Sequence, residues 1–303
     1  MGISASTRVG ACVRSRASAR IGVSALLMAT LAAGCSGSGP GPDRAEPPSA
    51  PGGGGVPSSG QVAASAPTPT GSPIPRPVQT TDPPTPAFWG RPVVEDGFDG
   101  TSVDASKWIV YDSPNDRVNP RTAAATKEDA GTLQLTGGIY GGKDLSGGIA
   151  SRLTQTHGRW EVRMRASKGA GYSAVALLWP KVFGDPEKAE IDFAEMIDPT
   201  KQSSDQYIHY GPNDTQKHNV LKADFTQWHV FALDWLPHRL TFWLDGQKVW
   251  DYQGDLTPER SQMGLALQND QVCDRGPGFC RTRSTPQWVT MYVDWIKIYR
   301  APG

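Results

Sequence analysis

Four acidic residues lie within AEIDFAEMID, residues 189–198, where the apolar side chains otherwise predict a buried strand. Successive side chains of a strand point to opposite faces, so Glu190 and Asp192 share one face. Glu195 lies five positions after Glu190, and in a regular strand it points to the other face. Carboxylates that share a face can divide acid, base and nucleophile roles between them. The direction of Glu195 therefore decides what chemistry this strand can do.

A β-bulge would bring the three acids to one face, because it inserts one extra residue into a strand. A bulge at residues 193–194 returns Glu195 to the face of Glu190 and Asp192, and it leaves Asp198 outside the group. A carboxyl separation of about 5 to 5.5 Å suits retaining cleavage of a glycosidic bond, whereas inverting cleavage needs room for a water. Crowded carboxylates cannot all ionise freely, so we expect at least one raised pKa.

The elements that must position these acids are short strands separated by turn residues. In residues 158–166, GRWEVRMRA, apolar and charged residues alternate, which predicts one buried and one exposed face. Residues 239–252 contain an Asp-Gly pair between two apolar arms, which indicates a β-hairpin. Many strands without crossover helices predict an all-β fold, a jelly-roll sandwich of two antiparallel sheets. Further predicted strands are GTLQLTG, SAVALLWP, QYIHYG, HVFALDWL, MGLALQN and VTMYVDWIKIYR.

Composition divides the chain into three zones. Residues 1–35 combine four arginines with an apolar run, a pattern typical of a signal peptide. Residues 36–88 contain 14 of the 26 prolines and few large apolar side chains, which predicts a disordered linker. Only residues 89–303 have the apolar and aromatic content of a core. We expect them to form one domain, and the protein to be a monomer.

The signal peptide ends in LAAGC, a string that resembles a bacterial lipobox. In that interpretation Cys35 is lipidated, becomes the mature N-terminus and anchors an extracellular protein to a membrane. The alternative is simple secretion, with Cys35 removed or free. The linker would then hold the folded domain away from its anchor.

The formal net charge of zero includes the four arginines of residues 1–35. Without them, 26 basic residues stand against 30 acidic ones, a difference of −4. No basic patch remains that would predict nucleic acid as a partner. Cys273 and Cys280, in CDRGPGFC, most simply form a disulfide in an exported chain, and a metal site is the alternative. No histidine spacing indicates a catalytic metal.

The string from Glu190 to Glu195 resembles the E-x-D-x-x-E signature of glycoside hydrolase family 16 in its bulged, laminarinase-like form. The resemblance extends over residues 89–303 and implies a concanavalin-like β-jelly roll with a cleft across one sheet. Other segments that agree with the family, in the same order, are EDGFDGTSVDASKW, GRWEVRMR, ALLWP, HYG, WHVFALDW and MYVDWIKIYR.

The resemblance implies a role for each of the three acids. Glu190 is the expected nucleophile, Glu195 the general acid and then base, and Asp192 the residue that orients and tunes the pair. The crowding of the carboxylates leads to a similar picture without choosing which glutamate has which role. The alternative is a solvated strand face with no catalytic function.

The resemblance also implies residues that contact the sugar. Trp179 would stack on a pyranose ring, for which an aromatic face is suited, although core packing is the alternative. His209 would hydrogen-bond a sugar or a catalytic carboxylate. Gln268 and Asn269 would face the cleft as polar contacts.

Many family members carry a structural calcium ion, for which the matching positions here are Gly97, Gly131 and Asp294. Asp294 lies in the apolar segment MYVDWIKIY, where a carboxylate needs a partner. A salt bridge would satisfy it as well as calcium would. Catalysis itself is expected to need no cofactor.

The expected function is therefore retaining endo-hydrolysis of a β-linked polysaccharide, with β-1,3-glucan as substrate. GYSAVALLWPKVF departs from the G-x-W-P-A-x-W-M run common in laminarinases, which leaves a galactan or mixed-linkage glucan open. Two further hypotheses are a polysaccharide-binding lipoprotein without turnover and a transglycosylase that uses the same residues.

Overall fold

The computed structural model describes residues 82–181 and 185–303. The predicted signal peptide, Cys35 and residues 36–81 of the predicted linker lie outside the described residues, so these remain predictions. In the described part of the chain, no helix has both the length and the apolar character needed to cross a membrane.

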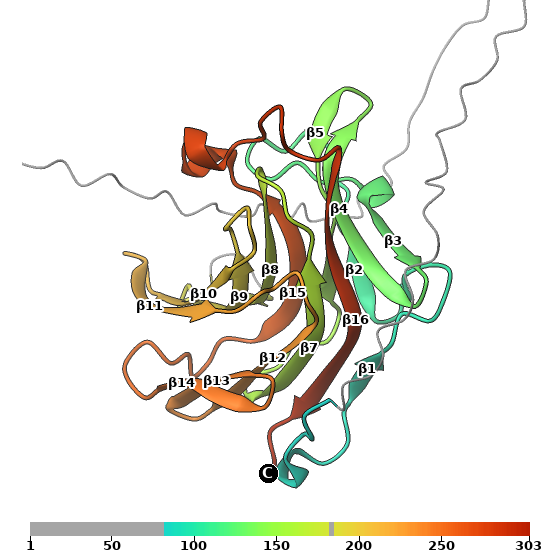
Figure 1. The fold of residues 1–303 in the computed structure, drawn as a ribbon. Coiled ribbons are helices and arrows are strands. Elements are labelled where there is room, and N and C mark those ends of the chain that lie inside the picture. The colour runs from blue at the N-terminus through green and yellow to red at the C-terminus, as the bar shows by residue number, and fades with distance from the viewer. Residues whose placement is uncertain (1–81, 182–184) are drawn as a thin grey trace, which may run out of the picture. The chain divides into compact units, whose positions relative to one another are not determined.

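Two antiparallel sheets form the domain and lie face to face (Figure 1). The nine-stranded sheet has the order β14 (Gln247–Tyr252), β13 (Arg239–Leu244), β12 (His229–Leu236), β7 (Gly158–Ala166), β16 (Trp288–Arg300), β4 (Thr132–Tyr140) and β3 (Thr126–Asp129), with β1 (Val94–Asp96) on β16 and β5 (Lys143–Leu145) on β4. The seven-stranded sheet has the order β11 (Thr215–Lys222), β10 (Ser203–Tyr210), β9 (Glu190–Met196), β8 (Tyr172–Pro180), β15 (Met263–Gln271), β6 (Gly148–Ser151) and β2 (Trp108–Val110). The short 3-10 helices are η1 (Ala87–Trp89), η2 (Ala123–Ala125), η3 (Cys273–Arg275) and η4 (Pro277–Phe279).

The core lies between the two sheets and consists of apolar side chains from the inner face of each. Trp160 of β7 stacks on Trp235 of β12, with ring centroids 6.1 Å apart. Phe193 of β9 and Met291 of β16 are fully buried in the same cluster. The predicted all-β sandwich is confirmed, and β8 and β9 lie near the centre of their sheet, as their apolar sequences indicated.

The hairpin of β13 and β14 forms at the turn that the local sequence predicts. Its turn is the predicted Asp245-Gly246 pair, whose φ angles of 49° and 76° are both positive. That conformation is typical of the two-residue turns whose twist matches that of paired strands. The bounds of β7, Gly158–Ala166, coincide with the predicted strand.

The charged face of β7 corrects the prediction of an exposed surface. Arg159, Glu161 and Arg163 are all buried. They form a network in which Arg159 pairs with both Glu161 and Asp234, and Arg163 pairs with Asp294. Alternation in the sequence identifies a polar face, but it does not tell whether another segment covers that face.

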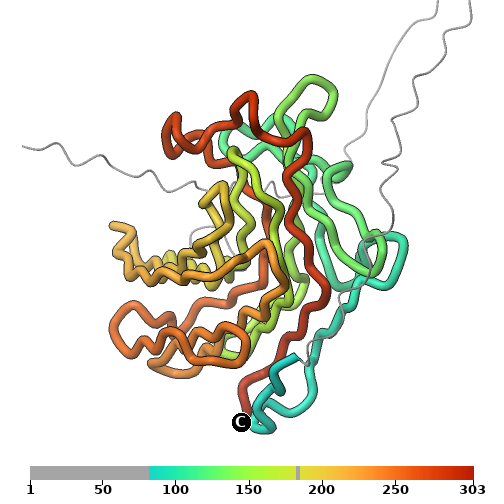
Figure 2. Tube along the Cα trace, viewed as in Figure 1, coloured from blue at the N-terminus to red at the C-terminus, as the bar shows by residue number. Residues whose placement is uncertain are grey.

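The covering segment is residues 82–86, which we call the strap. The hydroxyl of Thr85 donates to the carboxylate of Glu161 at 2.8 Å, and Asp82 pairs with Arg163 at 3.1 Å. The indole of Trp295 also donates to Asp82, at 3.0 Å. Composition had placed these residues in the linker, yet they pack on the outer face of the nine-stranded sheet. Figure 2 shows the start of the described chain leading to β1, which pairs with the C-terminal part of β16.

Candidate active site

The bulge lies in β9 where the spacing of the acids required it. Ala194 pairs with Ala176 of β8, whereas Asp192 pairs with the next residue, Leu177, so Phe193 is an extra residue in β9. The pairing of β9 with β10 on its other side shifts at the same place. The predicted bulge is therefore confirmed. Phe193 and Ala194 both lie in the core between the sheets.

The three acids consequently share the outer face of the seven-stranded sheet, which we call the carboxylate face. Asp192 and Glu195 are buried and Glu190 is partly exposed. Their charges act on one another, since Asp192 raises the pKa of both glutamates. The structure thus brings together the three residues that the sequence predicted as catalytic, while Asp198 caps the turn after β9 through Thr200.

His209 of β10 lies directly across from Glu190. Its Nε2 is 3.3 Å from the carboxylate of Asp192, and its Nδ1 is 2.8 Å from that of Asp214. Burial alone would lower the pKa of His209, but the carboxylates of Asp192, Glu190 and Asp214 outweigh it and raise this pKa to about 10. The imidazolium therefore supplies a positive charge beside Glu190 and Asp192 at neutral pH.

We predict that the His209 ring does not titrate between pH 5 and 8, and that it loses its proton only as the pH rises through about 10. The Asp192→Asn variant, which removes one of the charges that hold the proton, should lower the pKa of His209 by about one unit or more. NMR titration of the imidazole protons in both proteins measures this. A His209 signal that titrates between pH 6 and 7 in the wild type would contradict the described network.

The two glutamates both hold protons more tightly than usual. Burial and the charge of Asp192 raise the pKa of Glu190 well above its ordinary range, although His209 lowers it. Burial likewise raises the pKa of Glu195, and with Arg275 acting in the opposite direction the result is about 7. The two carboxyls therefore share a proton near neutral pH, so that one can act as a general acid while the other is ionised.

Arg275 is a site residue that the sequence analysis missed. Its guanidinium donates to the carboxylate of Glu195, which lies 80 positions earlier in the chain. Arg275 belongs to η3, in the segment that follows β15. No spacing in the sequence links that loop to β9, and the cysteines that flank the arginine are the only local signal that the loop is held in place.

Trp179 and Gln268 also lie on the carboxylate face. Trp179 is partly exposed at the end of β8 and packs against Val175, Leu177 and Ala266. Gln268 pairs with Val175 across β15 and β8, and Val175 pairs in turn with Glu195. The side chain of Gln268 is buried and accepts from Arg121, which also pairs with Asp270.

Asn269 does not face the carboxylates, and the prediction of a cleft contact was wrong. It follows Gln268 in β15, so it points to the opposite side, between the sheets. There its amide donates to the backbone oxygens of Leu135 at 3.1 Å and Val289 at 2.7 Å. Two consecutive polar residues of a strand cannot both face the same side, and Asn269 instead links the two sheets.

Asp294, which supplies the side chain of the predicted calcium set, has an ion-pair partner in the structure. The carboxylate of Asp294, the only acid among Gly97, Gly131 and Asp294, pairs with the buried guanidinium of Arg163. Within the described residues, no cluster of three or more histidine, cysteine or acidic side chains could hold a metal ion. The salt bridge was the alternative explanation for Asp294, and it is the one that the structure shows.

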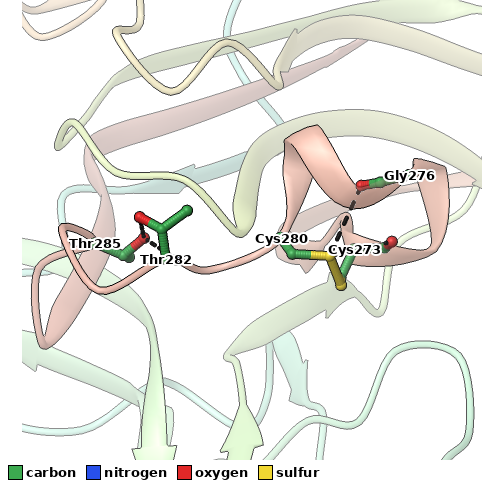
Figure 3. The surroundings of a disulfide bond; sticks show 5 residues. All are labelled: Cys273, Gly276, Cys280, Thr282 and Thr285. Carbon is green, nitrogen blue, oxygen red and sulfur yellow. Dashed lines mark hydrogen bonds between the residues drawn. A yellow bond between two sulfur atoms is a disulfide. The ribbon is translucent and has the colours of Figure 1, made fainter.

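The structure joins Cys273 and Cys280 in a disulfide, with Cα atoms 4.1 Å apart (Figure 3). This bond closes the loop that contains η3 and η4. Arg275 lies inside the closed loop, so the disulfide and the Glu195 contact belong to one structural unit.

The family model of glycosyl hydrolases family 16 matches residues 114–267, just over half of the chain, and the match includes all three acids. The protein therefore belongs to glycosyl hydrolase family 16. A "Crh-like protein" of Arthroderma benhamiae is 29% identical over 153 residues, which cover 46% of this chain and 29% of that protein. The chain thus aligns with less than a third of that relative.

Solved structures share the fold at low sequence identity. The catalytic domain of an endo-1,3-beta-glucanase (laminarinase) from Thermotoga petrophila is 18% identical with a TM-score of 0.60, covering 70% of this chain and 98% of that one. A prokaryotic beta-1,3-1,4-glucanase (lichenase) from a mouse hindgut metagenome is 18% identical with a TM-score of 0.58, covering 69% and 99%. These likenesses support the sandwich architecture described above.

Proposed function

We propose that the domain is a retaining endo-β-glucanase whose most favoured substrate is a β-1,3-linked glucan. The observation that carries the proposal is the bulge of β9, which places Glu190, Asp192 and Glu195 on one face of the sheet. Membership of the family supports glycoside hydrolysis. A protein that only bound polysaccharide would have no need to align three carboxylates at the cost of crowding their charges.

In the proposed mechanism, Glu195 gives its proton to the glycosidic oxygen while the Glu190 carboxylate attacks the anomeric carbon. The bond from that carbon to the leaving sugar breaks, and a bond to Glu190 forms. Water then attacks the anomeric carbon of this glycosyl-enzyme, Glu195 takes a proton from the water, and Glu190 is released. Two inversions at one carbon give net retention. Asp192, held by His209, orients the two glutamates.

A panel of β-1,3-, β-1,3-1,4-, β-1,4-glucan and galactan substrates tests the proposal. New reducing ends from a β-1,3-glucan, with early products of several sugars and the β-anomer formed first by NMR, would support it. If another member of the panel gave the new reducing ends instead, the proposed substrate would be wrong and the proposed mechanism would stand. Products longer than the starting oligosaccharide would favour the transglycosylase, and no release with measurable binding would favour the binding protein.

We further propose that the protein is exported and held to a membrane by a lipid on Cys35. The signal-peptide pattern and the LAAGC string support this location. Partitioning of the full chain into a detergent phase, lost in the Cys35→Ser variant, is the test. Equal partitioning of the two proteins would argue for simple secretion.

A further inference from the structure

We propose that Arg275 is a positioning residue for the acid/base Glu195, and that the Cys273–Cys280 disulfide holds it in that position. This inference deepens the proposed function, on which it rests. It concerns a residue outside the E-x-D-x-x-E motif, on a loop whose link to the site is seen only in the fold.

The contact is specific in its geometry. Nη2 of Arg275 donates to Oε1 of Glu195, and the Glu195 side chain is only 7% exposed while that of Arg275 is 40% exposed. The guanidinium therefore reaches from the surface to a buried carboxylate. A charged donor at a buried acid fixes the direction of the carboxylate as well as its charge.

The loop around Arg275 has little apolar packing of its own. None of the residues in η3 or η4 is buried. The loop is fixed at its two ends instead, where Val272 is buried at the start and Arg281 lies over the ring of Tyr172 at the finish. Between these ends the disulfide is the covalent constraint, and Figure 3 shows it closing the loop beside Gly276. Opening it would let the arginine move away from Glu195.

The surroundings of Glu195 explain why the arginine matters. The charged or titratable groups that act on it are Glu190 and Asp192 on its own strand and Asp270 on β15, together with Arg275. Asp205 of β10 lies directly opposite, and Tyr207 lies next but one along that strand. Arg275 is the cation in this set, and without it burial and the neighbouring acids would raise the pKa of Glu195 further.

The sign of the expected effect follows from the role of Glu195. A general acid must be protonated, so activity is lost as the pH rises through its pKa, which stands at about 7. Replacing Arg275 with Gln removes the positive charge and should move the alkaline limb of kcat/KM upward by about 1 to 2 pH units. The peak value of kcat should also fall, by about 10-fold, because the carboxylate loses its fixed direction.

The experiment compares the wild type with Arg275→Gln, Arg275→Lys and the matched control Arg283→Gln, an exposed arginine of the neighbouring segment. Lysine keeps the charge but not the planar guanidinium, so it should restore the position of the limb while kcat stays low. The control should leave both unchanged. An alkaline limb in Arg275→Gln that coincides with the wild type would overturn the proposal.

Reduction tests the role of the disulfide. Dithiothreitol, or the Cys273→Ser/Cys280→Ser variant, should shift the alkaline limb of the wild type in the same direction as Arg275→Gln. In the Arg275→Gln background reduction should add nothing, because both changes remove the same contact. A limb that stays in place on complete reduction would overturn the part assigned to the disulfide.

A second readout separates this inference from the proposed function. A ¹³C NMR titration of the glutamate carboxyls, assigned with Glu195→Gln, follows the proton of Glu195 without substrate. The resonance should titrate at higher pH in Arg275→Gln than in the wild type. If the titration shifted in this way but the protein hydrolysed no glycan, the proposed function would be wrong and the inference about Arg275 would stand. If the titration were unchanged in an active enzyme, the inference about Arg275 would be wrong.

Discussion

The Glu190→Gln variant is expected to lose glycan hydrolysis by roughly 10⁴-fold or more in kcat. The amide cannot form the glycosyl-enzyme, and without a nucleophile the double displacement has no first step. The fold should survive, because Glu190 lies on the outer face of its sheet and is partly exposed. Reducing-end assays measure the loss, and a circular dichroism melt checks the fold.

The same position gives a test that distinguishes the nucleophile from the acid/base. In Glu190→Ala, azide can occupy the vacated space and attack an activated β-glycoside directly, which gives an α-glycosyl azide by a single inversion. A β-glycosyl azide from this variant would show instead that Glu190 is the acid/base and Glu195 the nucleophile. The matched control is Glu95→Gln on β1, whose side chain is 59% exposed, and it should retain wild-type activity.

The Glu195→Ala variant is expected to lose about 10²- to 10⁴-fold in kcat on polysaccharide, the usual contribution of a general acid. An aryl β-glycoside with an acidic phenol needs little protonation, so its first step should remain fast and the glycosyl-enzyme should accumulate. Azide then attacks that intermediate and gives a β-glycosyl azide. Mass spectrometry of the trapped enzyme and NMR of the azide measure both results.

The pH profile supplies a further check on Glu195. Wild-type activity should fall as the pH rises through about 7, where Glu195 loses its proton. The Glu195→Ala variant should lack this alkaline limb on the aryl substrate, because it has no proton to lose. An alkaline limb that persists unchanged in the variant would assign it to another group.

The acid strand was predictable because the relevant physics is local. Side chains of a regular strand alternate strictly between its two faces. Glu195, five positions after Glu190, can therefore share its face only if one residue is inserted between them. Phe193 is that residue. The Asp245-Gly246 hairpin followed in the same way from the φ angles that its turn needs. These features depend on neighbouring residues and not on the rest of the fold.

The features that the sequence did not predict depend on contacts between segments that are far apart in the chain. Arg275 reaches Glu195 from a loop 80 positions later, and the strap buries the charged face of β7 from 76 positions earlier. Contacts between residues so far apart in the chain produce no periodic pattern in the sequence from which they could be predicted. Asn269 is different, since strict alternation already implied that it and Gln268 face opposite sides. At Asn269 the strand alternation holds, and the cleft contact implied by the family resemblance does not.

The strap also determines how mechanical tension would pass through the domain. A pull from the N-terminal side of the described chain would reach Asp82 first, and through it Arg163 of β7 and Trp295 of β16. Both strands belong to the nine-stranded sheet, whereas the acids lie on β9 of the other sheet. Drag on a tethered domain bound to a large polymer would thus load the sheet behind the site. A polymer held at the carboxylate face would pull on the other sheet, so the tension would cross the core between the two sheets.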